Sequence, residues 1–184
     1  MAGLEEIKVL LNTPEPPELG PGPRRGVKPE AELERTLNDR LRGHRLTEEK
    51  RHLIRALILL WHDHLDAAHR IAQDIETRDG SLLHGIMHRR EPDYGNARYW
   101  FRRVGEHPVF EQIGRRVGVL LDVDGERTLV KKLGSGQEWD PFAFIDCCES
   151  ATKSAATERQ RTILREIQAI ETRELLEWLG KVVE

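Results

Sequence analysis

A run of apolar residues at helical spacing, from Leu53 to Ile75, constrains the fold of this chain more than any other feature. Thr47 precedes the run as a residue type favoured at helix N-caps, and two glutamates follow it where acidic side chains interact well with the helix dipole. The turn-forming pair Asp79-Gly80 comes after the run. The pattern predicts one long helix from residue 48 to about residue 78. Because this helix is apolar over most of its surface, we expect it at the centre of a helical bundle.

Shorter helices are predicted on both sides of this element. Pro29 and Pro141 stand where proline favours the start of a helix. The predicted ranges are 30–42, 81–90, 96–104, 142–154 and 158–183. Asp124-Gly125, between two apolar runs, indicates one short β-hairpin near 117–132; the alternative is a helix that continues from Pro108. We therefore expect a mainly α fold, an irregular helical bundle.

The first 29 residues differ from the rest of the chain in composition. Residues 12–29 hold six of the nine prolines, and proline removes a backbone donor and favours extended chain. Residues 1–29 are therefore expected to form an N-terminal arm, with the apolar stretch 4–11 either docked as a helical turn or left as a free tail. Residues 30–184 have the length of one ordinary helical domain.

Charge and composition argue against several classes of protein. The 29 basic and 32 acidic residues give a net charge of −3, which argues against a nucleic-acid-binding protein. No apolar run approaches the roughly 18 residues of a membrane span, and the acidic start is unlike a signal peptide. Adjacent Cys147 and Cys148 cannot staple a fold, and we interpret them as buried small hydrophobic residues. We expect a cytoplasmic protein, and the apolar central helix is compatible with a homodimer.

Histidines concentrate in one window, with five of the eight between residues 62 and 88. Polar side chains with spacing i, i+4, i+7 recur on both predicted helices of this window: His62, Asp66 and His69 on the first, His84, His88 and Glu91 on the second. Helices joined by a short turn pack antiparallel, so the two stripes are expected to face each other. Imidazole and carboxylate groups bind Zn, Mn, Fe or Ni.

The window therefore predicts a divalent metal site. Its expected ligands are His62, Asp66, His69, His84 and His88. Glu91, or Asp66 where it does not bind the metal, is the expected catalytic acid or base.

Other interpretations of the histidines stay open. A solvent-exposed face, or a structural network of imidazoles and carboxylates, has the same pattern, and a pH-responsive histidine network is a further alternative. The doublet His62-Asp63 is similar to the HD pair of metal-dependent phosphohydrolases, with His44 or His52 as the upstream histidine. The predicted helix, however, continues past Asp63 without the break that is typical of those enzymes.

Arginine and aromatic residues concentrate immediately after the histidines, with seven arginines between residues 89 and 116. Guanidinium groups bind carboxylate or phosphate through paired hydrogen bonds, and aromatic faces stack on planar groups. The residues expected to bind a small anionic molecule are Arg89, Arg90, Arg102, Arg103, Tyr99 and Trp100. The alternative is structural pairing of the arginines with the four acids of the same segment.

Two segments resemble a family of uncharacterised bacterial and fungal proteins: WHDHLDAAHRIAQ (61–73) and GSLLHGIMHRREPDYGNARYWFRRVGEHPVF (80–110). That family shares a WHD-x-LD-x-AH helix, an LH-x-IMHRREPD stretch and an NA-x-YWFRRVG-x-HP stretch. The resemblance covers about fifty of the 184 residues and implies that the functional part lies within 61–110. The family brings no established activity, so the resemblance implies no substrate.

Two functional hypotheses follow. The first is a metal-dependent enzyme that acts on a small anionic substrate through its histidine and carboxylate cluster. The second is a non-enzymatic helical module that binds a ligand or a protein and uses the histidines as a structural network. The proline-rich arm and the concentrated aromatic residues favour the second hypothesis.

Overall fold

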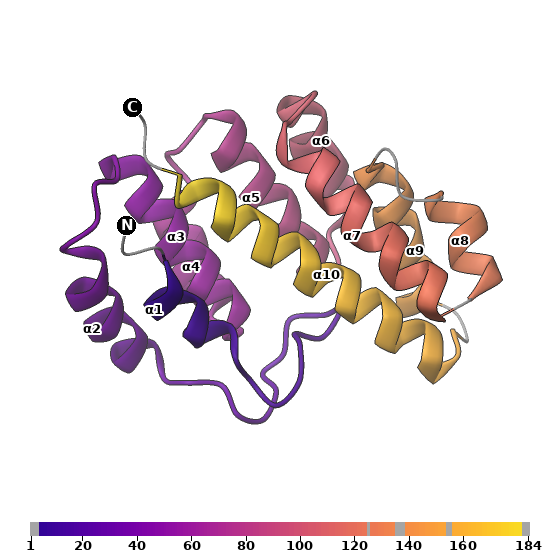
Figure 1. Ribbon diagram of the computed structural model, residues 1–184, viewed down its shortest axis with the longest axis horizontal. Coiled ribbons are helices and arrows are strands. Elements are labelled where there is room, and N and C mark those ends of the chain that lie inside the picture. The colour runs from indigo at the N-terminus through magenta and orange to yellow at the C-terminus, as the bar shows by residue number, and fades with distance from the viewer. Residues whose placement is uncertain (1–3, 125, 135–138, 154–155, 182–184) are drawn as a thin grey trace.

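The computed structural model describes residues 4–124, 126–134, 139–153 and 156–181. All regular structure within these ranges is helical, which confirms the predicted mainly α bundle (Figure 1). The helices in chain order are α1 (Glu5–Lys8), the short 3₁₀ helix η1 (Val9–Leu11), α2 (Glu30–Leu41), α3 (Glu48–Trp61), α4 (Leu65–Ala72), α5 (Arg78–Arg90), α6 (Tyr94–Val104), α7 (Val109–Asp124), α8 (Arg127–Leu133), α9 (Pro141–Lys153) and α10 (Glu158–Leu179). Among these described helices, none combines the length and apolarity that a membrane span requires.

Helix α3 lies in the core, as its apolar sequence predicts. Every residue from Ala56 to Trp61 is buried, because α3 packs against α2, α4, α5 and α10. Helix α10 contacts α3 near one end of the molecule and α9 near the other, and Figure 1 shows it running across the whole bundle. Its first turn has a capping box, in which the Thr157 side chain and Gln160 each bind the other's backbone N–H.

The predicted single long helix is wrong, because the chain breaks between α3 and α4. Helix α3 ends at Trp61, Asp63 adopts a left-handed conformation with φ of 66°, and α4 begins at Leu65. Aspartate tolerates this conformation better than most residues with a Cβ atom. The side chains of His62 and Asp63 bind the N-terminal arm, so contacts with a distant segment favour the break over continued helix.

The predicted β-hairpin near 117–132 is also wrong, and the helical alternative from Pro108 is present instead. Helix α7 covers 109–124, and α8 follows at Arg127. The buried hydrophobic side chains of α7 recur every four residues, at Val109, Ile113, Val117 and Leu121, which is a helical and not a strand period. Residue 125 of the expected turn lies outside the described residues.

Side-chain caps start two helices earlier than the sequence pattern predicts. The Thr77 hydroxyl accepts a hydrogen bond from the Gly80 N–H, so α5 starts at residue 78 rather than 81. The Asp93 carboxylate accepts one from the Asn96 N–H, so α6 starts at 94 rather than 96.

The N-terminal arm is docked on the helical body. Helix α1 and η1 bury Ile7, Leu10 and Leu11 against the bundle, so the docked alternative for residues 4–11 is present. Residues 12–29 then run across the molecule, with Leu19 buried and the carbonyls of residues 17 and 18 accepting hydrogen bonds from Gln168 of α10. The arm is therefore part of the folded body, and it ends beside the break between α3 and α4.

Cys147 and Cys148 are buried in α9 and are free thiols. Burial raises the pKa of Cys147 to about 11 and that of Cys148 to about 12. We expect both thiols of the folded protein to react with a disulfide reagent at pH 8 at least about 100-fold more slowly than in the unfolded chain, because so little thiolate is present. Thiol titration with and without denaturant tests this expectation, and rapid labelling of the folded protein would contradict it.

Candidate functional site

Three of the predicted metal ligands come together where α4 packs against α5. The ring centroid of His69 on α4 lies 5.7 Å from that of His84 and 5.6 Å from that of His88, both on α5. The centroids of His84 and His88 are 6.4 Å apart. His84 and His88 are buried and His69 is half-buried. We call these three residues the histidine triad.

Two rings of the triad use Nδ1 for contacts within their own helix. Nδ1 of His84 lies 3.0 Å from the Gly80 carbonyl oxygen, to which it donates when it carries the proton. Nδ1 of His88 lies 2.9 Å from Oε2 of Glu91, a close polar contact outside hydrogen-bond geometry. Burial lowers the pKa of His84; the Gly80 carbonyl opposes this shift, while the neighbouring His69, His88 and Arg103 add to it. His84 therefore favours the neutral imidazole, the form that binds metal ions.

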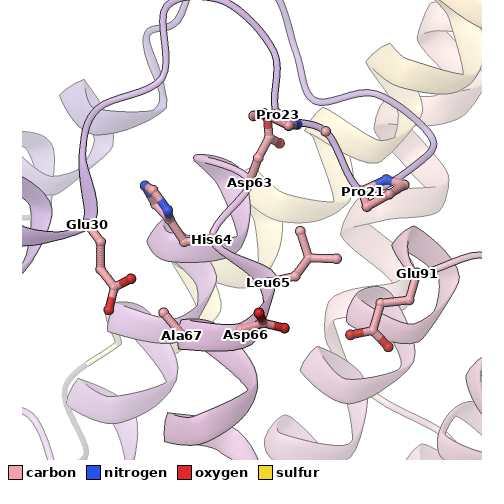
Figure 2. Close-up of a pocket in the computed structure, with 10 residues that line it drawn as sticks. Pro21, Pro23, Glu30, Asp63, His64, Leu65, Asp66, Ala67 and Glu91 are labelled. Carbon is pink, nitrogen blue, oxygen red and sulfur yellow. The ribbon is translucent and has the colours of Figure 1, made fainter.

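A pocket of about 450 Å³ is lined by residues of the arm, of the start of α2, of the break between α3 and α4, of the first turn of α4, and by Glu91, which follows α5. Glu91 connects this pocket to the triad through its contact with His88. Figure 2 shows Pro21 and Pro23 of the arm on one side of it, and Asp66 and Glu91 on the other. Because Asp66 starts α4 and Glu91 follows α5, the two helices run in opposite directions, as predicted. We call this cavity the arm pocket.

The carboxylates of the arm pocket differ in their partners. Asp63 is paired with two arginines, and Glu30 lies 3.1 Å from Nη2 of Arg70. Glu91 contacts His88 of the triad, and Asp66 is exposed. Of the carboxylates that line this pocket, Asp66 precedes His69 of the triad by three residues, and Glu91 follows His88 by three residues.

His62, the fourth predicted imidazole, does not join the triad. Its Nδ1 accepts a hydrogen bond from the Lys28 N–H at 3.1 Å, and its Nε2 lies 2.9 Å from the Leu10 carbonyl oxygen. The reason is the break after α3, which turns His62 toward the arm. Asp63 of the HD doublet is equally engaged, with Oδ1 2.6 Å from Nη1 of Arg24 and 2.7 Å from Nη2 of Arg90. Both residues thus anchor the arm.

Arg89 and Arg90, predicted to bind an anion, are buried inside the bundle. Arg89 forms an ion pair with Glu171 of α10, in which neither side chain is exposed. Arg90 donates to the Leu60 carbonyl at 2.6 Å and to the Gly20 carbonyl at 3.1 Å, besides its pair with Asp63. The expectation that these two arginines face an external anion is therefore wrong, because both side chains are buried and bind internal acceptors. Their acidic partners are Glu171 and Asp63 and not the four acids of the same segment that the alternative named.

The other predicted anion-binding residues lie on α6, beside the triad. The Trp100 ring stacks on His84 with centroids 4.2 Å apart. The guanidinium of Arg103 lies 5.3 Å from the centroid of Trp100, and its Nη1 donates to the Tyr99 hydroxyl at 3.3 Å. Arg102, Arg103 and Tyr99 are exposed. This part of the predicted anion site therefore remains accessible from solvent.

A polar network that the sequence analysis did not identify joins α5, α10 and the segment before α7. His107 lies with Nε2 2.8 Å from Oδ1 of Asp79, and the same oxygen accepts from the Trp178 indole at 2.8 Å. Burial raises the pKa of Asp79, but the hydrogen bonds from His107 and Trp178 outweigh it and hold that pKa below its ordinary value. Nδ1 of His107 accepts from the Val109 N–H. Both ring nitrogens are therefore used within the fold, and this network is structural.

Across the described ranges, no group of three or more His, Cys, Asp or Glu side chains is arranged to hold a metal ion. A tetrahedrally coordinated ion that lies about 2.1 Å from each ligating ring nitrogen requires imidazole ring centroids roughly 5 Å apart. All three centroid distances within the triad are larger than this. Searches of protein-family models, of curated proteins and of solved structures found no match for this chain.

Proposed function

We propose that the histidine triad binds one divalent transition metal when its rings close from centroid separations of 5.6–6.4 Å to roughly 5 Å, and that the protein is a metal-dependent enzyme for a small anionic substrate. The observation that carries the proposal is the arrangement of His84 and His88. Nδ1 of His84 contacts the Gly80 carbonyl oxygen and Nδ1 of His88 lies close to the Glu91 carboxylate, which leaves Nε2 of each ring for a ligand. Metal-binding histidines are oriented by this kind of contact.

The neighbouring groups supply what such an enzyme needs. A bound metal would lower the pKa of a water molecule and make it a nucleophile at neutral pH. Glu91 contacts His88 and lines the arm pocket, so it is the proposed acid or base, and Asp66 lines the same pocket. Arg102 and Arg103 are the proposed anion-binding residues, because they are the two exposed arginines of the predicted set.

The proposal includes a cellular location, which we argue from the state of the two cysteines. Cys147 and Cys148 are free and buried, which fits a reducing environment. We therefore place the proposed enzyme in the cytoplasm.

Metal content tests the proposal directly. We expect purified protein to carry about one equivalent of Zn, Mn, Fe or Ni, and a metal at 100 times its Kd to stabilise the fold by about 2.7 kcal/mol. His69→Gln and His88→Gln should each weaken metal affinity about 100-fold or more, since loss of even an outer contact costs 10- to 100-fold. Elemental analysis and thermal unfolding with added metals measure both effects.

His52→Gln is the matched control, because His52 is an exposed histidine of α3 away from the triad. It should keep metal content and the thermal shift. If unsupplemented protein holds no metal and none of the four metals raises its melting temperature, the proposal is wrong.

The second candidate is the non-enzymatic helical module with a structural histidine network. It is favoured by the absence, within the described residues, of a preformed metal-holding group and by the stacking of His84 on Trp100. It predicts that His69→Gln changes stability only and leaves ligand or partner binding unchanged. The same experiment therefore separates the two candidates.

A further inference from the structure

The tripeptide His62-Asp63-His64 at the break between α3 and α4 holds the arm at several backbone positions. The Lys28 peptide lies between the two histidines: its N–H donates to Nδ1 of His62, and its carbonyl oxygen lies 2.8 Å from Nε2 of His64. Asp63 accepts from the Arg24 N–H at 2.9 Å. On the other side, Nε2 of His62 lies 2.9 Å from the carbonyl oxygen of Leu10. One side chain, His62, therefore ties both ends of the arm to the bundle.

These contacts define the protonation state of His62. Nδ1 accepts a hydrogen bond from a backbone N–H and therefore carries no proton, while Nε2 carries the proton and donates to Leu10. Protonation would place an N–H group on Nδ1 directly opposite the Lys28 N–H, so this hydrogen bond would be lost. His64 differs, because its Nε2 donates to a carbonyl and does so in both the neutral and the protonated form.

We infer that His62 is a proton-sensitive latch that holds residues 12–29 over the arm pocket and releases them in mild acid. Three arm residues, Pro21, Gly22 and Pro23, line that pocket. Gly22 lies so close to Asp63 that a Cβ atom at Gly22 would be 2.7 Å from the Asp63 carboxyl. Release of the arm therefore removes one wall of the pocket and exposes Asp66 and Glu91 to larger molecules.

The charged groups around His62 define the sign of the effect. They are Arg24 of the arm, Glu32 of α2, and the adjacent Asp63 and His64. Burial lowers the pKa of His62; the Leu10 carbonyl opposes this shift, Arg24 and His64 add to it, and Asp63 opposes it.

The docked arm therefore binds fewer protons than the released arm. Docking is complete above the ordinary histidine pKa of 6.5 and weakens as the pH falls below it. The docking equilibrium should fall about tenfold per pH unit until the lowered pKa of the docked state is reached.

Hydrogen exchange followed by mass spectrometry tests the latch on the full chain. After correction for the intrinsic pH dependence of exchange, peptides covering 12–29 should exchange about fivefold faster at pH 5.5 than at pH 6.5. His62→Asn keeps an oxygen acceptor and cannot titrate, so it should abolish this step. His64→Gln retains a donor at the same peptide group, and the step should persist in that variant.

The inference is overturned if corrected exchange of the arm in the wild-type chain is the same at both pH values, or if the step survives in His62→Asn. Circular dichroism will show whether each variant folds. If one does not, the comparison of arm exchange at the two pH values in the wild-type chain still tests the inference. None of these readouts depends on metal, so the latch and the proposed metal site fail or succeed separately.

Discussion

Glu171→Gln is expected to destabilise the protein by about 3–5 kcal/mol, the usual cost of removing one partner of a buried ion pair. Glu171 and Arg89 have no exposed side-chain surface, and together they connect α10 to α5. The guanidinium of Arg89 also lies 4.5 Å from the ring centroid of Phe144. Without the carboxylate, a full positive charge would remain in an apolar environment. Denaturant unfolding monitored by circular dichroism measures the loss.

Two variants control this prediction. Glu111→Gln removes an exposed carboxylate, 3.6 Å from Arg115 on the same helix, and should leave the unfolding midpoint unchanged. The double variant Arg89→Met with Glu171→Leu removes both charges and should recover most of the stability. A double variant as unstable as Glu171→Gln would show that packing, and not the unpaired charge, causes the loss.

Asp63→Asn is expected to cost about 3–5 kcal/mol and to release the arm, since it leaves two buried guanidinium groups without a countercharge. The side chains of Arg24 and Arg90 are only 5% and 2% exposed, and both bind Oδ1 of Asp63. Asparagine has the same size and also tolerates positive φ, so the backbone break at φ of 66° is preserved. Loss of charge is therefore the main change.

Chemical unfolding and trypsin cleavage at Arg24 and Arg25 of the arm measure the two effects of Asp63→Asn. Cleavage there should become faster, because the arm is held near this point by Asp63. Asp66→Asn is the matched control, since Asp66 is an exposed carboxylate of the same pocket. Equal protection of the arm in Asp63→Asn and the wild-type chain would contradict the proposed anchoring role.

Much of the fold follows from local patterns. The apolar period of α10 and the cap at Thr47 are features of short segments, and each forms where the sequence places it within a few residues. Asp79-Gly80, expected as a turn, instead lies in the first turn of α5. The interpretation of 117–132 as a hairpin failed because Asp124-Gly125 was weighed above the four-residue spacing of Val117 and Leu121. A helical period was present in the sequence and gave the correct alternative.

The candidate site was predictable only in part. Spacing on two adjacent helices was enough to place His69, His84 and His88 together, because antiparallel packing across a short connection leaves little choice. It failed for His62, whose partners Leu10 and Lys28 are 52 and 34 residues away. It failed as well for Arg89, whose partner Glu171 is 82 residues away. Spacing along a helix carries no information about such partners.

The sequence by itself determined the helical class, the apolar centre in α3 and the pairing of imidazoles across α4 and α5, because periodicity and short connections act within neighbouring turns. The tertiary structure alone decided where the chain breaks, which arginines are buried, and that the arm closes over the pocket. Those outcomes depend on charges and backbone groups that meet only after folding, when a buried guanidinium or N–H must find a partner.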